Sequence, residues 1–330
     1  MADFIIKRLI SGGIITNYFC SSHCLHCLYK SGPGWPQRYI EPETCENTMH
    51  ILRKLGCRSI HIGGGEPLLR PDELIQVIET ANRSNINIDY VETNSSWFKG
   101  PDTAETTLSK LRKAGLRTLL ISISPFHNQY VPFFKVKGVL EACRQTGIKI
   151  FPWISEFLQD LSEFDPQKTH SLDEYTEKFG DGYLTGILER YWIHMGGRAL
   201  ELFRPVLAKK PLEQIIVENS ENCAPELSDT NHYHIDLFEN YIPGLCSGLA
   251  IAVQDLGRPL AKERYPLLTT LFNAGIKGLL KDAQKLYGFT PVQDGYINKC
   301  DLCTEIRTFL VQQNFNQSLE LNPKEFYRLR

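Results

Sequence analysis

Short apolar segments alternate with helical patterns along the first half of the chain, and this alternation constrains the fold more than any other feature. The apolar segments, which suit β-strands, lie at residues 14–18, 59–62, 86–93, 118–123 and 148–154. The helical patterns between them lie at residues 42–55, 71–84, 103–114 and 131–146. Strands and helices that alternate at this spacing predict right-handed crossovers and a parallel sheet, so we expect an α/β fold.

Three cysteines follow the first expected strand at a Cys-x3-Cys-x2-Cys spacing, namely Cys20, Cys24 and Cys27. Three thiols cannot all enter regular disulfide bridges, and zinc usually takes four protein ligands. Three thiolates in one loop instead suit a [4Fe–4S] cluster that leaves one iron open to a small ligand. The alternatives are three unlinked thiols, or three ligands of a structural zinc whose fourth ligand is distant.

Composition and charge indicate an enzyme of about two domains in a reducing compartment. The chain has 330 residues and ten cysteines, and it shows no export signal at its start. We therefore expect a cytoplasmic protein whose thiols bind metal rather than form disulfides. The net charge of −2 argues against nucleic-acid binding. The most apolar stretch, residues 241–253, is interrupted by Pro243 and is too short to span a membrane.

Together with the run Gly-Gly-Gly-Glu-Pro at residues 63–67, the cysteine spacing resembles the radical S-adenosylmethionine (radical SAM) superfamily. The resemblance covers about residues 10–200 and implies a partial (βα)6 barrel with a catalytic [4Fe–4S] cluster at the three cysteines. It implies that S-adenosylmethionine (SAM) chelates the open iron. Reductive cleavage then gives a 5′-deoxyadenosyl radical, which abstracts hydrogen from a substrate carbon. A reductant such as flavodoxin or ferredoxin is the implied partner.

Most residues that the resemblance assigns to SAM follow the expected strands, where parallel α/β sheets bind ligands. The glycines and the glutamate are implied to hold the methionine ammonium group, the small polar residues a ribose or carboxylate, and the arginine the SAM carboxylate. These residues are Gly64, Gly65, Glu66, Asn94, Ser122, Ser124 and Arg198. Ordinary turns and caps are the alternative for the small polar residues, and a surface arginine at a helix start is the alternative for Arg198.

Further candidates lie around this expected site. Residues 191–195 form a candidate sixth strand that ends shortly before Arg198. Within the cysteine loop, His26 is expected to pack against the cluster. Just past the fourth strand, His127 is either structural or faces the pocket.

A second set of cysteines lies in the C-terminal part of the chain, at Cys223, Cys246, Cys300 and Cys303. An expected strand at residues 232–237, a turn, and residues 241–243 indicate a β-hairpin that opens a second module. Residues 223–310 loosely resemble a SPASM or twitch module, which carries auxiliary iron–sulfur clusters in many radical SAM maturases. The resemblance implies one auxiliary [4Fe–4S] cluster at these four cysteines, since too few other cysteines remain for two.

Two alternatives remain for this second set. The four thiols either bind a structural zinc, or leave one of Cys223 and Cys246 free as a hydrogen-atom donor. The resulting domain organisation has a barrel at residues 1–200, a connecting helical segment at 201–222 and a small α+β iron–sulfur module at 223–330.

The remaining cysteines and two histidines are expected to be structural. Cys45, Cys57 and Cys143 lie in apolar surroundings, where buried thiols are the default. His232 and His234 alternate with a tyrosine on one expected strand and share a face. Without a third ligand nearby, they are interpreted as structural.

The reaction that follows hydrogen abstraction is not encoded in these motifs. Peptide or protein modification is the leading hypothesis, because SPASM-type modules are frequent in enzymes of that kind. Fewer than twenty residues precede Cys20, which is too few for an N-terminal peptide-recognition domain. The second hypothesis is therefore a small-molecule substrate in cofactor or natural-product synthesis. A non-catalytic iron–sulfur or zinc-binding protein is the hypothesis of another class.

Overall fold

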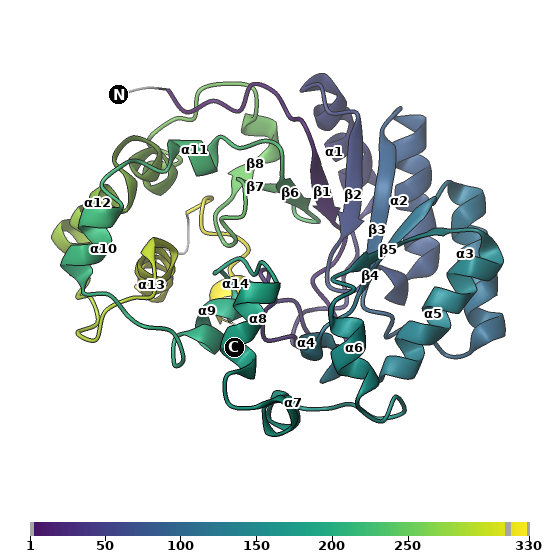
Figure 1. The fold of residues 1–330 in the computed structure, drawn as a ribbon. Helices are drawn as coiled ribbons and strands as arrows, with labels where there is room; N and C mark the ends of the chain where they lie inside the picture. Colours follow the sequence, from purple (N-terminus) through teal and green to yellow (C-terminus); the bar gives the residue numbers. More distant parts are fainter. Residues whose placement is uncertain (1–2, 314–317, 329–330) are drawn as a thin grey trace.

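One eight-stranded sheet organises the computed structural model, which describes residues 3–313 and 318–328. Its strand order is β5-β4-β3-β2-β1-β6-β7-β8 (Figure 1). The strands are β1 (Gly12–Ile15), β2 (Ser59–Gly63), β3 (Asn87–Thr93), β4 (Thr118–Ser122), β5 (Lys149–Trp153), β6 (Tyr233–Asp236), β7 (Asn240–Ile242) and β8 (Ile251–Ala252). Strands β1 to β5 pair in parallel with their neighbours, which confirms the predicted α/β fold and its parallel sheet.

Four helices cover one side of the parallel strands, and further helices lie across the molecule from them (Figure 1). The covering helices are α1 (Pro42–Lys54), α2 (Pro71–Arg83), α3 (Pro101–Ala114) and α5 (Phe133–Thr146). Proline opens α1, α2 and α3, because the first turn of a helix does not need that N–H group. These helices bury their apolar faces against one face of the sheet. They do not cover the carboxyl ends of the strands, where a site can form.

The shorter elements between and after these units complete the fold. They are η1 (Pro67–Leu69), α4 (Pro125–Asn128), α6 (Phe157–Ser162), α7 (Leu172–Phe179), α8 (Tyr183–Arg190), α9 (Arg198–Phe203), α10 (Leu212–Glu218), α11 (Ala224–Leu227), η2 (Val253–Asp255), α12 (Pro266–Tyr287), α13 (Lys299–Gln312) and α14 (Glu325–Arg328). Among the described residues, no helix combines the length and the apolar character that crossing a membrane requires.

The prediction of a sixth strand at residues 191–195 is wrong, because this segment between α8 and α9 forms no strand. Its apolar alternation arises because Tyr191 and Ile193 are buried while Trp192 is 65% exposed, without any ladder of hydrogen bonds. The sixth parallel strand is instead β6, which pairs with β1 on the opposite side from β2. The resulting sheet is therefore extended next to its first strand, not after its fifth.

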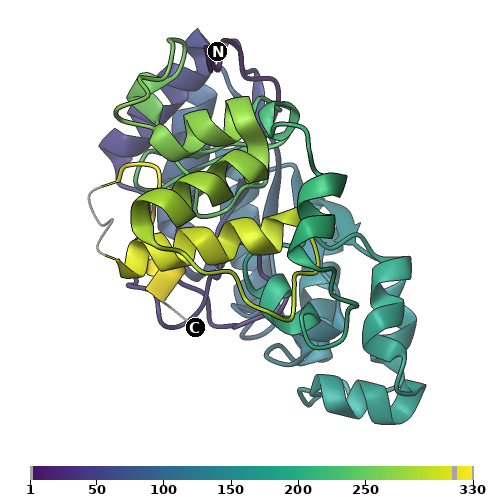
Figure 2. The ribbon, with the colours of Figure 1, turned by 90° about the vertical axis from the view of Figure 1, so that its left-hand side faces the viewer.

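The expected C-terminal hairpin exists, but it continues the main sheet. Strand β6 pairs with β7 in antiparallel fashion, and β7 pairs with β8 in the same way. Beyond them, α12 and α13 lie side by side and face the viewer in Figure 2. The division of the chain at residues 200 and 223 therefore stays a prediction.

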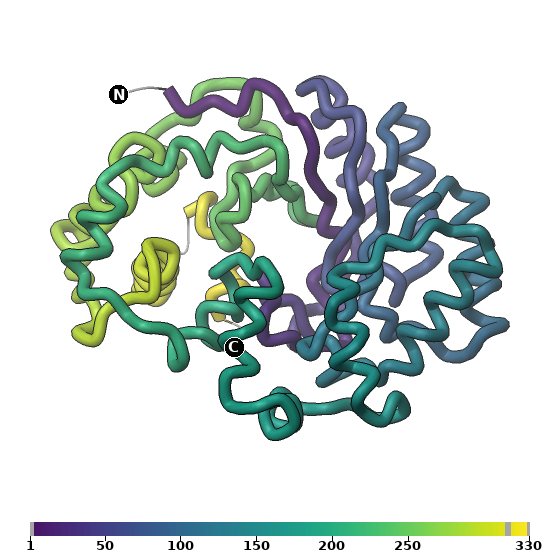
Figure 3. Tube along the Cα trace, in the orientation of Figure 1, coloured from purple at the N-terminus to yellow at the C-terminus, as the bar shows by residue number. Residues whose placement is uncertain are grey.

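The N-terminal segment links the two halves of the molecule. In Figure 3 it runs along the residues that follow β8. The backbone N–H of Gly257 donates to the carbonyl of Ile6 at 3.0 Å, and that of Leu260 donates to Phe4 at 3.0 Å. The ring of Phe4 also stacks on Phe272 of α12 with centroids 4.5 Å apart. These contacts fix the C-terminal helices relative to β1.

Candidate active site

A cavity of about 300 Å³ lies at the carboxyl ends of the parallel strands. Most of the predicted site residues line it: Cys20, Cys24, Cys27, Gly64, Gly65, Asn94, Ser122 and Arg198. His26 and His127 line it as well, whereas Glu66 and Ser124 are not among the lining residues. The topology thus brings together side chains from the loops after four different strands.

The cysteine loop closes on itself through its backbone. The N–H of Cys20 donates to the carbonyl of Gly32 at 3.3 Å, and the N–H of Cys27 donates to Cys24 at 3.1 Å. Cys20 and Cys24 are buried, and Cys27 is half-buried. Burial, with a smaller effect of the nearby Glu66 carboxylate, raises the pKa of the Cys20 thiol to about 12. A bound metal would deprotonate such thiols outright.

The thiols of neither cysteine set are drawn together at one point. A tetrahedral zinc with Zn–S bonds of about 2.3 Å draws its sulfurs to within about 4 Å of one another. Among the described residues, neither cysteine set converges as ligands of a single metal ion would. Both sets line cavities.

The glycine-rich turn packs directly against the backbone that enters the cysteine loop. The N–H of Gly65 donates to the carbonyl of Asn17 at 2.6 Å. A Cβ atom at Gly65 would lie 2.0 Å from the backbone oxygen of Phe19, so no larger residue fits. Glycine is therefore required here for the close approach of two backbones, in addition to any contact with a cofactor.

Glu66 lies behind the cavity wall as a buried carboxylate. Its Oε1 accepts hydrogen bonds from the N–H of Leu68 and the hydroxyl of Thr93, both at 3.0 Å. Its Oε2 accepts from the N–H of Asn94 at 2.6 Å. Burial raises the pKa of Glu66 to about 7, although these hydrogen bonds oppose the shift. Glu66 thus joins the ends of β2 and β3, and its predicted contact with SAM stays a prediction.

Asn94 faces a cysteine sulfur. Its side-chain nitrogen donates to the Sγ of Cys20 and to the hydroxyl of Ser22, each at 3.3 Å. Hydrogen bonds to cluster sulfurs tune reduction potentials, so this amide is placed to influence a bound cluster.

The two serines after β4 lie differently. Ser122 lines the cavity, whereas Ser124 is fully buried and caps α4. The hydroxyl of Ser124 lies 2.7 Å from Nδ1 of His127. The ring of His127 in turn contacts His26 edge-on, with centroids 5.0 Å apart. Ser124 therefore positions an aromatic wall of the cavity.

Arg198 is buried and holds the cysteine loop through its carbonyl groups. Its Nε donates to the carbonyl of Cys24 at 2.8 Å, and its Nη2 donates to the carbonyl of Ser31 at 2.5 Å. The backbone N–H of Arg198 donates to the carbonyl of Cys27 at 3.1 Å. The planar guanidinium bridges both ends of the loop, and the alternative of a surface arginine is wrong.

The four C-terminal cysteines line a second cavity, of about 340 Å³. They come from the start of α11, the loop after β7 and the first turns of α13: Cys223, Cys246, Cys300 and Cys303. Burial raises the pKa of the Cys223, Cys246 and Cys300 thiols, that of Cys300 to about 11. Residues His194, His232 and Leu245 line both cavities, so the two cavities are neighbours.

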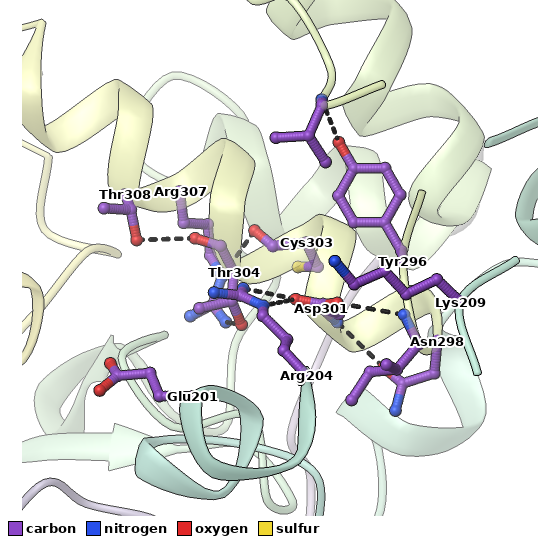
Figure 4. A network of polar contacts seen from close by, with 12 residues as sticks. Glu201, Arg204, Lys209, Tyr296, Asn298, Asp301, Cys303, Thr304, Arg307 and Thr308 are labelled. Carbon is purple, nitrogen blue, oxygen red and sulfur yellow. Dashed lines mark hydrogen bonds and ion pairs between the residues drawn. The ribbon is translucent and has the colours of Figure 1, made fainter. Parts of the chain in front are cut away.

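A polar network fixes the start of α13, and with it two of these cysteines (Figure 4). Asn298 caps the helix by accepting from the N–H of Asp301 at 3.0 Å. Arg204 pairs with the buried Asp301 carboxylate, and its Nε lies 2.7 Å from Oδ1. Further along, Arg307 donates to the carbonyl of Ser247 at 2.8 Å and so ties α13 to the loop that carries Cys246.

The sequence analysis did not identify several residues that line the first cavity. Tyr90 and Glu92 line the first cavity, as do Trp153 and Tyr191. Burial raises the pKa of Glu92 to about 7. Alternation along the third expected strand is the signal that would have placed Tyr90 and Glu92 on one face.

The interpretation of His232 and His234 as lacking a third ligand is wrong. His61 on β2 lies beside them, and its Nε2 is 2.9 Å from Nε2 of His234. The third histidine was missed because only the pairing of β6 with β1 brings these distant parts of the chain together.

Comparison with known proteins finds similarity in the part of the chain where strands and helices alternate. The family model described as the radical SAM superfamily matches residues 14–151. A probable GTP 3′,8-cyclase of Methanothermobacter marburgensis is 27% identical over 135 residues, which are 41% of this chain and 42% of that protein. Its counterpart from Methanocaldococcus jannaschii is 26% identical over 181 residues, 47% of this chain and 58% of that protein. The chain thus spans about half the length of these curated relatives.

Other similarities are shorter or weaker. The mycofactocin maturase MftC of Mycobacterium ulcerans is 29% identical over 73 residues, 22% of this chain and 19% of that protein. Among solved structures, BtrN in complex with AdoMet and 2-DOIA has a TM-score of 0.46 at 12% identity, covering 84% of this chain and 91% of that one. Native anSMEcpe with bound AdoMet has a TM-score of 0.46 at 13% identity, covering 94% and 99%.

Proposed function

This chain belongs to the radical SAM superfamily of enzymes, and we propose that Cys20, Cys24 and Cys27 hold the [4Fe–4S] cluster at which it cleaves SAM reductively. The single observation that carries this proposal is the first cavity, where the three thiols meet the glycine turn and the strand ends. When bound, the cluster and SAM supply a 5′-deoxyadenosyl radical that abstracts hydrogen from a substrate carbon. An external reductant would supply the electron for the cleavage, and the protein would bind and orient the reacting groups.

The residues around the cavity would bind and orient the cluster and SAM. Gly64 and Gly65 offer a bare backbone edge beside the cysteine loop, and Ser122 offers a hydroxyl at the end of β4. Asn94 orients the Cys20 sulfur, and Arg198 fixes the loop. The aromatic side chains of Trp153 and Tyr191 form part of the cavity wall.

For the C-terminal cysteines, we propose one auxiliary [4Fe–4S] cluster. Its support is the neighbouring cavity, whose shared lining residues allow an auxiliary cluster to approach a substrate in the first cavity. The fixed start of α13 favours a preformed site, since Asp301 and Arg307 hold this helix independently of any metal.

For the substrate, we propose a peptide or protein side chain. Its support is the second cysteine set beside the first cavity, since SPASM-type modules are frequent in peptide-modifying enzymes. The similarity to a mycofactocin maturase agrees with a maturation reaction. The second candidate is a small molecule, which the longer matches to GTP 3′,8-cyclases favour.

The experiment is anaerobic incubation of the reconstituted protein with SAM and dithionite, followed by quantification of 5′-deoxyadenosine. Production of 5′-deoxyadenosine is expected without added substrate, and its absence at full iron content would contradict the proposal. The two substrate classes are separated by adding GTP or a short peptide encoded beside the gene. The true substrate class is the one that accelerates SAM cleavage and incorporates or loses hydrogen in a deuterium-labelled assay.

A further inference from the structure

Three histidines converge on the inner face of the sheet, where a glycine leaves room for them. In the strand register, Gly13 of β1 lies between His61 of β2 and His234 of β6. A Cβ atom at Gly13 would lie 2.2 Å from Nε2 of His61, so only glycine lets the two imidazoles meet above the middle strand. His232, just before β6, supplies the third ring, which stacks on His61 with centroids 5.5 Å apart.

The distances between these rings suit a single metal ion. One nitrogen from each ring lies within 4.8 Å of the other two. The Nε2 atoms of His61 and His234 are 2.9 Å apart. Two imidazoles on one ion, with metal–nitrogen bonds of about 2.0–2.1 Å, have nitrogens about 2.9–3.4 Å apart at coordination angles between 90° and tetrahedral. The observed separation falls at the short end of that range.

The surroundings resemble those of a built metal site. The Nδ1 of His234 lies 2.6 Å from the hydroxyl of Tyr29, which fixes the ring and directs Nε2 toward the other two histidines. A carboxylate oxygen of Glu92 lies 3.8 Å from Nε2 of His61. His61 and His234 are 4% and 6% exposed, so neither ring is a solvated surface group.

A hydrogen bond between two neutral imidazoles would account for His61 and His234 alone. It does not account for the convergence of His232, which is exposed and would cost little to point elsewhere. A single cation bound to one nitrogen of each ring would account for the positions of all three histidines.

We propose that His61, His232 and His234 bind one divalent transition-metal ion, with zinc as the probe ion, in the wall of the first cavity. Imidazole nitrogens suit zinc and its first-row neighbours, and three protein ligands leave a coordination position open. His232 and His234 line the first cavity and His232 also lines the second, so the proposed ion would border both cavities. An oxygen or nitrogen donor of the substrate would take that position and be oriented there.

The test uses the full chain, anaerobically reconstituted with iron and sulfide, then equilibrated with zinc and desalted. Zinc is counted, and its ligands are identified by X-ray absorption at the zinc edge, where iron does not interfere. We expect about one zinc per chain with nitrogen neighbours at about 2.0–2.1 Å. His232→Asn, at an exposed position that does not endanger folding, should abolish zinc retention. His50→Asn, on the exposed side of α1, is the matched control and should retain it.

A second variant probes the surrounding hydrogen bond. Tyr29→Phe removes the hydroxyl that orients His234, so the zinc dissociation constant should rise roughly 10–100-fold. Zinc with sulfur neighbours at about 2.3 Å, zinc retained by His232→Asn, or no zinc bound to the wild-type chain would each overturn the proposal. The result is independent of SAM cleavage, because the ion is counted whether or not the protein is active.

Discussion

Replacing Arg198 tests whether this buried arginine holds the cysteine loop or, as the family resemblance implied, binds the SAM carboxylate. The structure shows its guanidinium bonded to the carbonyls of Cys24 and Ser31. Arg198→Ala would leave the buried carbonyl of Ser31 unpaired, at a cost of about 1–3 kcal/mol, while the carbonyl of Cys24 would keep the N–H of Cys27 and lose one hydrogen bond worth about 0.5–1.5 kcal/mol. We therefore expect the free energy of unfolding to fall by about 1.5–4.5 kcal/mol. Arg198→Lys keeps the charge but loses the planar fork, so about half of that loss is expected.

The assay is anaerobic urea unfolding monitored by tryptophan fluorescence, together with a count of bound iron after reconstitution. Arg117→Ala is the matched control, because this exposed arginine also donates to backbone carbonyls, those of Arg112 and Leu116. Its effect should stay within about 0.5 kcal/mol. Wild-type stability and iron content in Arg198→Ala, with only SAM affinity reduced, would refute the structural role and favour the ligand role.

Three further outcomes are expected. Gly65→Ala forces a Cβ atom into the backbone that enters the cysteine loop, so the free energy of unfolding in urea should fall by about 1–3 kcal/mol. Gly186→Ala, which has open space around it in α8, should leave that free energy unchanged or raise it. Equal effects of the two substitutions would contradict the packing argument. Cys303→Ala should lose about four irons per chain and spare uncoupled SAM cleavage, and an unchanged iron count would contradict the auxiliary cluster. Partial burial raises the pKa of Glu92 from 4.5 to about 7, so its contribution to stability is present below pH 4.5 and lost as pH rises through 7; the contribution is small, because the side chain is 39% exposed and solvent screens it. Glu92→Gln should therefore show a shallower fall in unfolding midpoint over this range, and an unchanged slope would contradict the shift.

The alternation of apolar and helical segments sufficed to predict the parallel half of the sheet. Each of the first five expected strands is present, with ends that differ by at most a few residues, because local pattern and tertiary burial agree there. The strand predicted at residues 191–195 is absent, because Tyr191 and Ile193 are buried by side-chain packing and not by strand pairing. The placement of β6 beside β1 depends on a contact between distant parts of the chain, which no local pattern encodes.

The candidate site was likewise predictable from the sequence only in part. The cysteines and glycines carry their chemistry in their spacing, so the sequence predicted that they line one cavity. The direction of a side chain is not encoded in that way. Glu66 and Ser124 are turned to neighbouring backbone and side-chain groups by hydrogen bonds that only the fold creates. The cluster of His61 with His234 likewise depends on the missing Cβ of Gly13.

The most direct test of the central claim compares two cysteine variants in the 5′-deoxyadenosine assay. Cys24→Ala removes a thiol of the first cavity, while Cys143→Ala removes an equally buried thiol from α5, far from any proposed cluster. The account predicts that Cys24→Ala forms no 5′-deoxyadenosine and that Cys143→Ala forms it as the wild-type chain does. Normal 5′-deoxyadenosine production by Cys24→Ala would contradict the assignment of the catalytic cluster to this loop.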